Sequence, residues 1–290
     1  MSNSPSSTHL LANNDQKESD IVRNNANYSA TASNINYDNN SSPLNNVQNV
    51  DKGMTSTLLL AVFAAVSGTA FHFGYASGVM NSPQDFIQQF INETNHRRNN
   101  ETQISDSTVT LIFSFAVSIF ALGGMLGGLF GGFVTERLGR KGGMFYNNIV
   151  SFLACILMFM SKPFYSYELL IIGRFFLGLA CGYGSSVAPT YINEVSPMNL
   201  RGTLGASFQL GVVLLLFVSQ VISLKPILGS ETTWHYALGL PIVLSVLQVI
   251  LLCFVPESPK YLLIKKNNSV EAEKGSFIFF YNRRKITVLD

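Results

Sequence analysis

The chain has 290 residues, of which 47% are hydrophobic and only 12% are charged, and its formal net charge at pH 7 is +2. This composition is typical of a membrane protein, and the small net charge gives no reason to expect a nucleic-acid partner. The three cysteines, Cys155, Cys181 and Cys253, fall inside apolar runs at spacings that suit neither a zinc site nor a disulfide framework. We therefore expect no metal site.

Residues 1–52 are rich in Asn and Ser and contain few large apolar side chains. Such a segment cannot bury enough apolar surface to offset the entropy that is lost on ordering, so we expect a disordered tail. The tail also lacks a basic segment followed by an apolar run, so it does not have the pattern of a cleavable signal peptide.

Six apolar runs follow the tail, and crossing a bilayer takes about 20 residues of helix. No charged residue occurs from Ser107 to Thr135 or from Gly142 to Ser161. Glu136–Gly143 lies between these two stretches and is expected to be a short charged turn, whereas Asn81–Ser107 is expected to be a polar loop. The predicted fold is an all-α membrane protein with a six-span bundle within residues 53–258. The expected spans are Thr57–Met80, Thr108–Val134, Met144–Met160, Glu168–Tyr191, Gly202–Leu224 and His235–Val255.

Lysine and arginine in the short connections predict the orientation, because cytoplasmic loops carry an excess of both. Two glycosylation sequons begin at Asn92 and Asn100, in the first loop, which is outside if the tail is inside. We therefore predict a multi-pass protein of the plasma membrane with a cytoplasmic N-terminus. In this orientation the inner cations, Lys52, Arg137, Arg140, Lys141, Arg201, Lys260, Lys265 and Lys266, outnumber the outer ones, Arg97, Arg98, Lys162 and Lys225.

Glycines recur at every fourth position in the second expected span, and this spacing lets a neighbouring backbone approach closely. We predict that the second and fourth spans pack tightly against neighbouring helices. A phosphate-binding loop is the functional alternative, but no Gly-Lys-Ser/Thr sequence follows these glycines and no strand precedes them. The glycines form one row of Gly123, Gly127 and Gly131 and a second row of Gly124, Gly128 and Gly132, and Gly178 and Gly182 repeat the spacing in the fourth span.

Polar side chains inside the expected spans are costly in lipid and are therefore functional candidates. Arg174 in the fourth span is the costliest, and a structural role, in which it holds helices in register, is favoured for it. Glu168 is the nearest opposite charge in the sequence, but a separation of six residues does not place both on one helical face. Gln209 in the fifth span can donate and accept hydrogen bonds, which suits a solute rich in hydroxyl groups. A substrate contact and an interhelical hydrogen bond both remain open for Gln209.

Three charged turns are expected on the inner side, and each contains a carboxylate and at least one cation. Because the turns recur at the same level, we prefer an ion-pair network to separate solvated charges. After the sixth span, Ser258 followed by Pro259 predicts the start of a short amphipathic helix on the membrane surface, within residues 259–274. The residues of the expected network are Glu136, Arg137, Arg140, Lys141, Glu194, Arg201, Glu257 and Lys260.

Five ordered motifs resemble those of the sugar porter family in the major facilitator superfamily. Two further motifs in the first span, Phe73-Gly74-Tyr75 and Gly78-Val79-Met80-Asn81, are similar to the facilitative glucose transporters of animals. The five are Arg137-x-Gly139-Arg140-Lys141, Gly173-Arg174-Phe175, Glu194-Val195-Ser196-Pro197 with Leu200-Arg201-Gly202, Gln209-Leu210-Gly211, and Pro256-Glu257-Ser258-Pro259-Lys260.

The resemblance implies the N-terminal half of a major facilitator fold, a three-plus-three inverted repeat, with a hexose held near the bilayer midplane against a second six-span half. Carried over by position, Gln209 would contact a sugar hydroxyl, and Ser77 and Asn81 would line the outer approach. The charged turns would close the inner gate. Such transport needs neither ATP nor a bound cofactor.

Residues 275–290 depart from the family pattern, which would continue through a cytoplasmic region into six more spans. We expect this segment to be an atypical end from a truncated isoform or an incomplete gene model.

Two functions remain open. One is facilitative hexose transport by alternating access, and the other is a non-transporting half-transporter that associates with or regulates a full-length sugar transporter. The expected partners are a hexose, membrane lipid and a second transporter chain. No catalytic constellation or cofactor fingerprint indicates an enzyme.

Overall fold

The computed structural model describes residues 54–99, 105–264 and 279. The predicted tail (residues 1–52), the sequon at Asn100 and the predicted atypical end (275–290, apart from Phe279) lie outside the described residues. Six helices in the described part are long and apolar enough to cross a membrane, which confirms the predicted six-span helical fold.

Four of the six spans are continuous helices, and the first and the sixth are each broken once. The first span consists of α3 (Ser56–Ser67) and α4 (Ala70–Gly78), and the sixth consists of α10 (Trp234–Gly239) and α11 (Pro241–Phe254). The continuous spans are α6 (Asp106–Leu138), α7 (Arg140–Met160), α8 (Tyr167–Val195) and α9 (Arg201–Ile222), and the shorter helices are α5 (Gln84–Asn99) and α12 (Pro259–Ile264).

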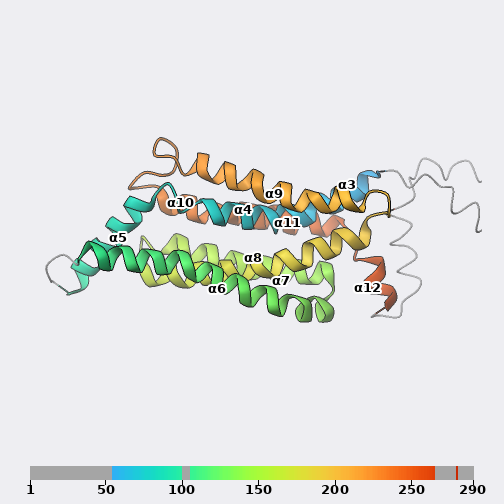
Figure 1. Cartoon of the computed structure of the whole chain (residues 1–290), viewed down its shortest axis with the longest axis horizontal. Helices are drawn as coiled ribbons and strands as arrows, with labels where there is room; N and C mark the ends of the chain where they lie inside the picture. Colours follow the sequence, from blue (N-terminus) through green and yellow to red (C-terminus); the bar gives the residue numbers. More distant parts are fainter. Residues whose placement is uncertain (1–53, 100–104, 265–278, 280–290) are drawn as a thin grey trace, which may run out of the picture. The chain divides into compact units, whose positions relative to one another are not determined.

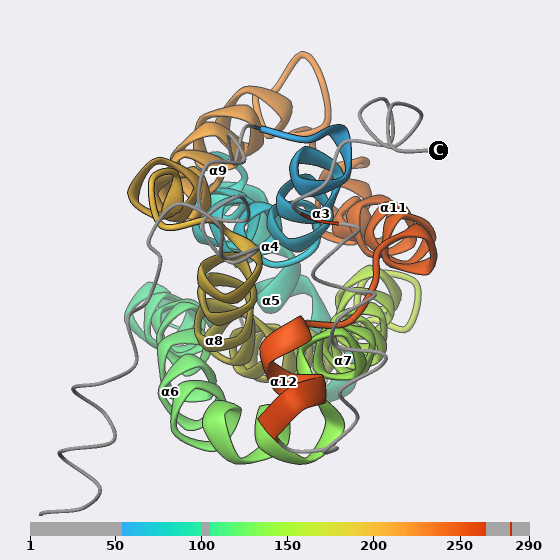
Figure 2. The ribbon, with the colours of Figure 1, turned by 90° about the vertical axis from the view of Figure 1, so that its right-hand side faces the viewer.

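Figure 1 shows the spans running side by side, with α5 at one end of the bundle and α12 at the other. We call these the α5 end and the α12 end. In Figure 2, which looks along the bundle, α8 lies among the other spans. Accordingly, 61% of the most apolar stretch of α8 is buried, compared with 22% for α6 and 17% for α9. The corresponding share of the first span is 67%, so the first span and α8 are the most covered members of the bundle, and α6 and α9 are the least covered.

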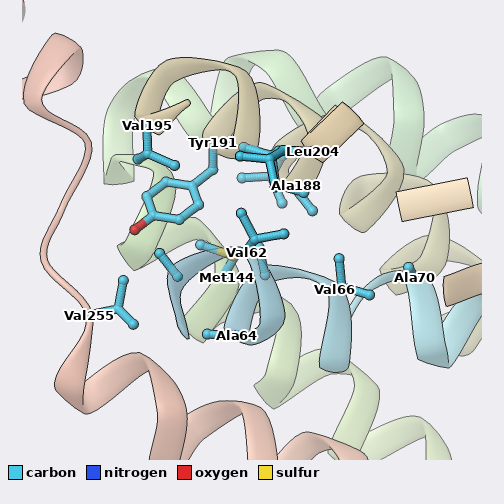
Figure 3. Close-up of a cluster of buried hydrophobic side chains, with 14 of the residues drawn as sticks. Val62, Ala64, Val66, Ala70, Met144, Ala188, Tyr191, Val195, Leu204 and Val255 are labelled. Atoms are coloured by element: carbon cyan, nitrogen blue, oxygen red, sulfur yellow. The ribbon is translucent and has the colours of Figure 1, made fainter. Parts of the chain in front are cut away.

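One hydrophobic core lies near the α12 end and is formed mainly by α3 and α8 (Figure 3). Tyr191 of α8 is fully buried in it, and its hydroxyl donates a hydrogen bond of 3.0 Å to the backbone oxygen of Pro256. Val62 and Val66 of α3 and Met144 of α7 complete the cluster around this ring. The core thus fixes the chain after the sixth span against the central helix.

The second and fourth spans, α6 and α8, pack tightly against each other as predicted, and the two glycine rows of α6 differ in how closely they approach α8. A Cβ added at Gly123 or Gly127 would overlap a backbone carbonyl of α8, and one added at Gly131 would overlap the hydroxyl of Ser186. In the second row, a Cβ at Gly128 would lie 3.9 Å from the nearest atom, and a Cβ at Gly132 would meet nothing within 4 Å. Adjacent rows lie about 100° apart on the helix, so the first row points at α8, whereas Gly124 and Gly128 of the second row lie at its margin, 3.7 and 3.9 Å from α8 carbonyls when a Cβ is added.

The predicted polar loop Asn81–Ser107 contains a helix, α5, which the sequence reading missed. Ile87, Phe90, Ile91 and Thr94 are buried, and their spacing is that of one helical face. Phe90 packs on Trp234 with the ring centroids 5.3 Å apart. The signal was present in the sequence, but the surrounding polar residues obscured it.

The predicted charged turn Glu136–Gly143 is also shorter than expected. The α6 helix continues to Leu138 and α7 begins at Arg140, so Gly139 alone joins them. Gly139 has a φ of +83°, a conformation that residues with a Cβ rarely adopt. Arg140 and Lys141 therefore lie in the first turn of α7.

Candidate functional site

The side of the bundle formed by α6, α8 and α9 exposes several uncharged hydrogen-bonding side chains. Gln209 of α9 is exposed, and so are Ser185 and Asn193 of α8, although α8 is otherwise largely buried. In Figure 2, α6, α8 and α9 lie along one side of the bundle. We call this the open face. The sequence reading missed Ser185 and Asn193, whose spacing of eight residues places them two turns apart on the same side of α8.

The three predicted substrate residues lie on two neighbouring helices, α4 and α9. Ser77 of α4 is half-buried, and its hydroxyl donates 2.8 Å to the backbone oxygen of Phe73, whereas Asn81 after α4 is exposed. A Cβ on Gly74 would overlap the carbonyl of Val212, so these two residues lie at the same height. Ser77 follows Gly74 by three residues and Gln209 precedes Val212 by three. With a rise of 1.5 Å per residue, Ser77 and Gln209 therefore lie about 9 Å apart along the bundle. They therefore occupy successive levels.

Three cavities between described helices do not include the predicted substrate residues. The largest has a volume of about 390 Å³, lies between α7 and α11, and is lined mainly by apolar side chains together with Asn148 and Ser245. A cavity of about 180 Å³ lies beside Tyr183, and one of about 210 Å³ lies beside Tyr75. Gln209, Ser77 and Asn81 line none of the three; Gln209 and Asn81 are exposed, and Ser77 is half-buried.

Arg174 joins three spans from inside the bundle. Its side chain is buried, Nη1 donates a hydrogen bond of 2.8 Å to the backbone oxygen of Ala76 in α4, and the guanidinium carbon lies 4.5 Å from the ring centroid of Phe120 in α6. No carboxylate of the described residues forms an ion pair with it. A backbone dipole and an aromatic face therefore stabilise the charge, as a structural role would require.

At the α12 end, an ion pair joins the beginning of α7 to the end of α8. Arg140 Nε donates 2.9 Å to Glu194 Oε2, and Nη2 donates 2.7 Å to Oε1. The side chains of Arg140 and Glu194 are only 16% and 7% exposed. The hydroxyl of Ser258 donates a further bond of 2.5 Å to Glu194. A bidentate pair with these extra bonds is the stronger type of charge contact.

Glu257 binds the same region through the backbone rather than through a cation. Its carboxylate accepts hydrogen bonds from the backbone N–H groups of Arg140 and Lys141, at 3.0 to 3.2 Å, and from that of Ser258 at 2.9 Å. It thus caps the first turn of α7, where free N–H groups and the helix dipole favour an anion. The α12 helix begins next, and the hydroxyl of Ser258 accepts the N–H of Tyr261 at 3.4 Å.

The other predicted network residues are arranged differently. Arg137 is exposed and lies over the ring of Phe133 at 4.2 Å, and its backbone oxygen accepts the hydroxyl of Tyr261. Glu136 has a partner in the structure, and its side chain is exposed. Arg201 and Lys260 are exposed and form no ion pair with another described residue. The predicted network is therefore centred on three residues: Arg140, Glu194 and Glu257.

At the α5 end, Glu168 pairs with Arg98 of α5 and not with Arg174. The guanidinium binds both carboxylate oxygens, and Nη2 lies 3.0 Å from Oε2. Both side chains are more than 40% exposed. The hydrogen bonds to Glu168 raise the pKa of Arg98, so this cation persists over the whole working pH range. The contact joins α5 to the beginning of α8.

The first predicted glycosylation site lies in a folded helix. Asn92 is half-buried in α5, its Oδ1 is enclosed without a hydrogen-bond partner, and the sequon residue Thr94 is fully buried. A glycan on Asn92 would have to displace this packing. Glycosylation of either predicted acceptor stays a prediction, and Asn100 lies outside the described residues.

Comparison with known proteins agrees with this fold. The sequence model described as "Sugar (and other) transporter" matches residues 60–277. The chain belongs to the sugar transporter family. It is 45% identical over 222 residues to the rat solute carrier family 2, facilitated glucose transporter member 5, a match that covers 77% of this chain and 44% of the rat protein.

Other relatives show the same partial coverage. Chicken facilitated glucose transporter member 1 is 44% identical over 220 residues, which are 76% of this chain and 44% of that protein. The E. coli xylose transporter XylE, solved in a partially occluded inward open conformation, has a TM-score of 0.68 at 20% identity, with 81% of this chain and 58% of XylE covered. The structural likeness supports the major facilitator fold alone. This member of the family spans less than half the length of the curated relatives that it matches.

Proposed function

We propose that this chain forms a six-span half of a facilitative hexose transporter and that the open face contributes one wall of the sugar path. The observation that carries the proposal is the exposure of Gln209 on α9, beside exposed Ser185 and Asn193 of α8. Uncharged amides and hydroxyls suit a hexose, because each can exchange hydrogen bonds with sugar hydroxyls without leaving a charge unpaired.

The levels of the candidate residues suggest an order of contacts along the path. Asn81 follows α4 at the α5 end, Ser77 lies one turn before it, and Gln209 lies about 9 Å further along the bundle. In this proposal, Asn81 and Ser77 line the approach and Gln209 contacts the sugar near the midplane. The partial exposure of Ser77 and the exposure of Gln209 support this role.

We further propose that the α12 end faces the cytosol and that the α5 end faces the outside of the plasma membrane. Arg137, Arg140, Lys141, Arg201 and Lys260 all lie at the α12 end, and cytoplasmic connections carry such an excess. In the transport cycle, the cluster of Arg140, Glu194 and Glu257 would keep α7 and α8 together at the inner gate. The inner gate would then close as one unit.

The second candidate function is a non-transporting half that associates with a full-length sugar transporter. Large apolar side chains on α9 favour an association of this kind, because Leu210 is 70% exposed and Phe217 is 63% exposed. Lipid or another protein chain would cover these residues. In this case the chain would regulate its partner without carrying sugar itself.

Uptake of radiolabelled glucose into proteoliposomes that contain only this chain tests the first function. Saturable uptake that Gln209→Ala weakens would support it. Gln220→Ala is the matched control, since Gln220 is also an exposed glutamine of α9 but lies near the α5 end. An equal loss in both variants would contradict a specific role for Gln209. No uptake, together with co-purification with a full-length facilitative glucose transporter, would favour the second function.

A further inference from the structure

The breaks in the first and sixth spans leave backbone groups without their usual helical partners inside the bundle. The α3 helix ends at Ser67, and α4 begins again at Ala70, so Gly68 and Thr69 form the first break. The α10 helix ends at Gly239, and α11 begins with Pro241, which has no N–H to donate. A free carbonyl is costly in an apolar environment, so a broken membrane helix needs partners from elsewhere.

The sixth span supplies a further partner for the break in the first, where the hydroxyls of Ser67 and Thr69 donate to the backbone oxygens of Ala64 and Ala65. Gln248 of α11 is fully buried, and its Nε2 donates 2.9 Å to the backbone oxygen of Ala64 and 3.3 Å to that of Ala65. Asn148 of α7 holds Gln248 in place by donating 2.7 Å to its Oε1. A Cβ on Gly68 would overlap the Gln248 side chain, so glycine at the break makes room for this contact. Figure 3 shows Ala64 among the side chains of the core cluster.

The first span supplies the partner for the break in the sixth. The hydroxyl of Tyr75 in α4 donates 2.9 Å to the backbone oxygen of Ala237 in α10. Ala237 precedes Pro241 by four residues, so its oxygen is the one that the missing N–H of Pro241 would have bonded in a continuous helix. Tyr75 is 1% exposed, so water does not take its place. The two breaks are thus repaired reciprocally.

These contacts divide the two spans into two pairs. Gln248 joins α3 and α11, the segments on the α12 side of the breaks, whereas Tyr75 joins α4 and α10, the segments on the α5 side. His72 of α4 and Ser245 of α11 are both buried, and the His72 Nε2 and Ser245 Oγ atoms are 3.1 Å apart. This contact joins one pair to the other across the breaks.

We propose that α4 and α10 turn as one unit relative to α3 and α11, and that the contact between His72 and Ser245 holds the two units in the conformation seen here. The α5-side unit includes α4, the helix that contains Ser77 and ends shortly before Asn81. It also contacts α5 through Trp234 and Phe90. We infer the movement from the contacts alone. Its use in transport, which would be to open the approach to the sugar, rests on the proposed function.

Distances between paired nitroxide labels, measured by dipolar spectroscopy on the whole chain in lipid nanodiscs, test the proposal. One pair, at positions 59 and 236, reports on the two units relative to each other, and a second pair, at positions 59 and 250, reports within the α3–α11 unit. Leu59, Tyr236 and Ile250 are all exposed in the structure. Cys253 is exposed and is replaced by serine, whereas Cys155 and Cys181 are buried and are retained.

Ser245→Ala removes the contact with His72 at little cost in volume. We expect the displaced population of the 59–236 pair to rise about threefold, the effect of an average hydrogen bond between membrane helices, while the 59–250 distances stay unchanged. Ser196→Ala is the matched control, because Ser196 is a buried serine whose hydroxyl bonds only locally to Ile192, and it should change neither pair.

Unchanged 59–236 distances in Ser245→Ala would overturn the proposal, and so would an equal change in both pairs, which would indicate general loosening. The measurement is made without sugar. If the chain does not bind glucose, the proposed function is wrong, but the distances between the two units still test the proposed movement. Addition of glucose in a second arm then asks whether sugar shifts the 59–236 pair.

Discussion

The packed interior and the open face of this bundle contain the same kinds of residue in different roles. Gly127 lies against the backbone of α8, whereas Gly132, on the adjacent row of the same helix, has nothing within 4 Å of an added Cβ. Gln248 is fully buried and bonds two backbone oxygens, whereas Gln209 is exposed on α9. Residue type therefore identifies candidates for packing and for binding, and the surroundings decide between them.

The difference arises because a helix in a bundle has covered and uncovered sides. A buried amide costs free energy unless it is bonded, so interior polar groups are committed to structural partners. An exposed amide is free to exchange partners, which a binding surface needs. Substitutions on the interior should therefore change stability, and those on the open face should change binding alone.

Gly127→Ala should have the largest effect on stability. The new methyl group would overlap the carbonyl of Leu179, and backbone atoms of a neighbouring helix cannot move aside as a side chain can. We expect a loss of about 3 kcal/mol, the upper part of the range for overpacking. Thermal unfolding in detergent, followed by circular dichroism, measures it. A loss below about 0.5 kcal/mol would contradict this expectation, because it would show that α6 and α8 can move apart to make room for the methyl group.

Glu194→Gln should have the next largest effect. The amide can still accept hydrogen bonds, but the guanidinium of Arg140, with a side chain only 16% exposed, loses its counter-charge. We expect a loss of about 2 kcal/mol, at the low end for breaking a buried charge pair. Glu93→Gln is the control, since Glu93 is exposed and bonds only Gln89 in its own helix. Equal losses in the two variants would contradict a special role for the charges at the α12 end.

The sequence was sufficient for the six spans because long uncharged runs, such as Ser107–Thr135, can hardly form anything else in a bilayer. It was insufficient where a contact depends on the register between distant helices. The pairing of Glu168 with Arg98 and the capping of α7 by Glu257 join residues 70 and about 117 positions apart. No local pattern encodes such pairs.

The candidate site shows the same division. Gln209 was identified because a polar side chain in an apolar span is costly and an amide can both donate and accept hydrogen bonds, but the exposure of Ser185 and Asn193 depends on which side of α8 remains uncovered. The breaks in the first and sixth spans were also missed. Gly68 was one of many glycines in the sequence, and only the position of Gln248 shows why glycine is needed there.

Gln209→Ala should leave stability nearly unchanged and abolish the proposed sugar contact. Gln209 is exposed, so we expect a change in unfolding free energy within about 0.5 kcal/mol, as for other surface substitutions. Binding of glucose, measured by the change in intrinsic tryptophan fluorescence of the single Trp234, should weaken by about tenfold, the effect of roughly 1.4 kcal/mol. A clear loss of stability would place Gln209 among the interhelical contacts instead.

Gly132→Ala should have the smallest effect of all. It makes the same chemical change as Gly127→Ala, on the same helix, five residues away, but the added methyl group meets nothing within 4 Å. We expect a change within about 0.5 kcal/mol by the same unfolding measurement. Because helix, residue type and substitution are matched, the difference between the two variants isolates the contact with α8. A loss in Gly132→Ala as large as that in Gly127→Ala would mean that α6 presents its second glycine row to a neighbour, and the open face would then not extend over α6.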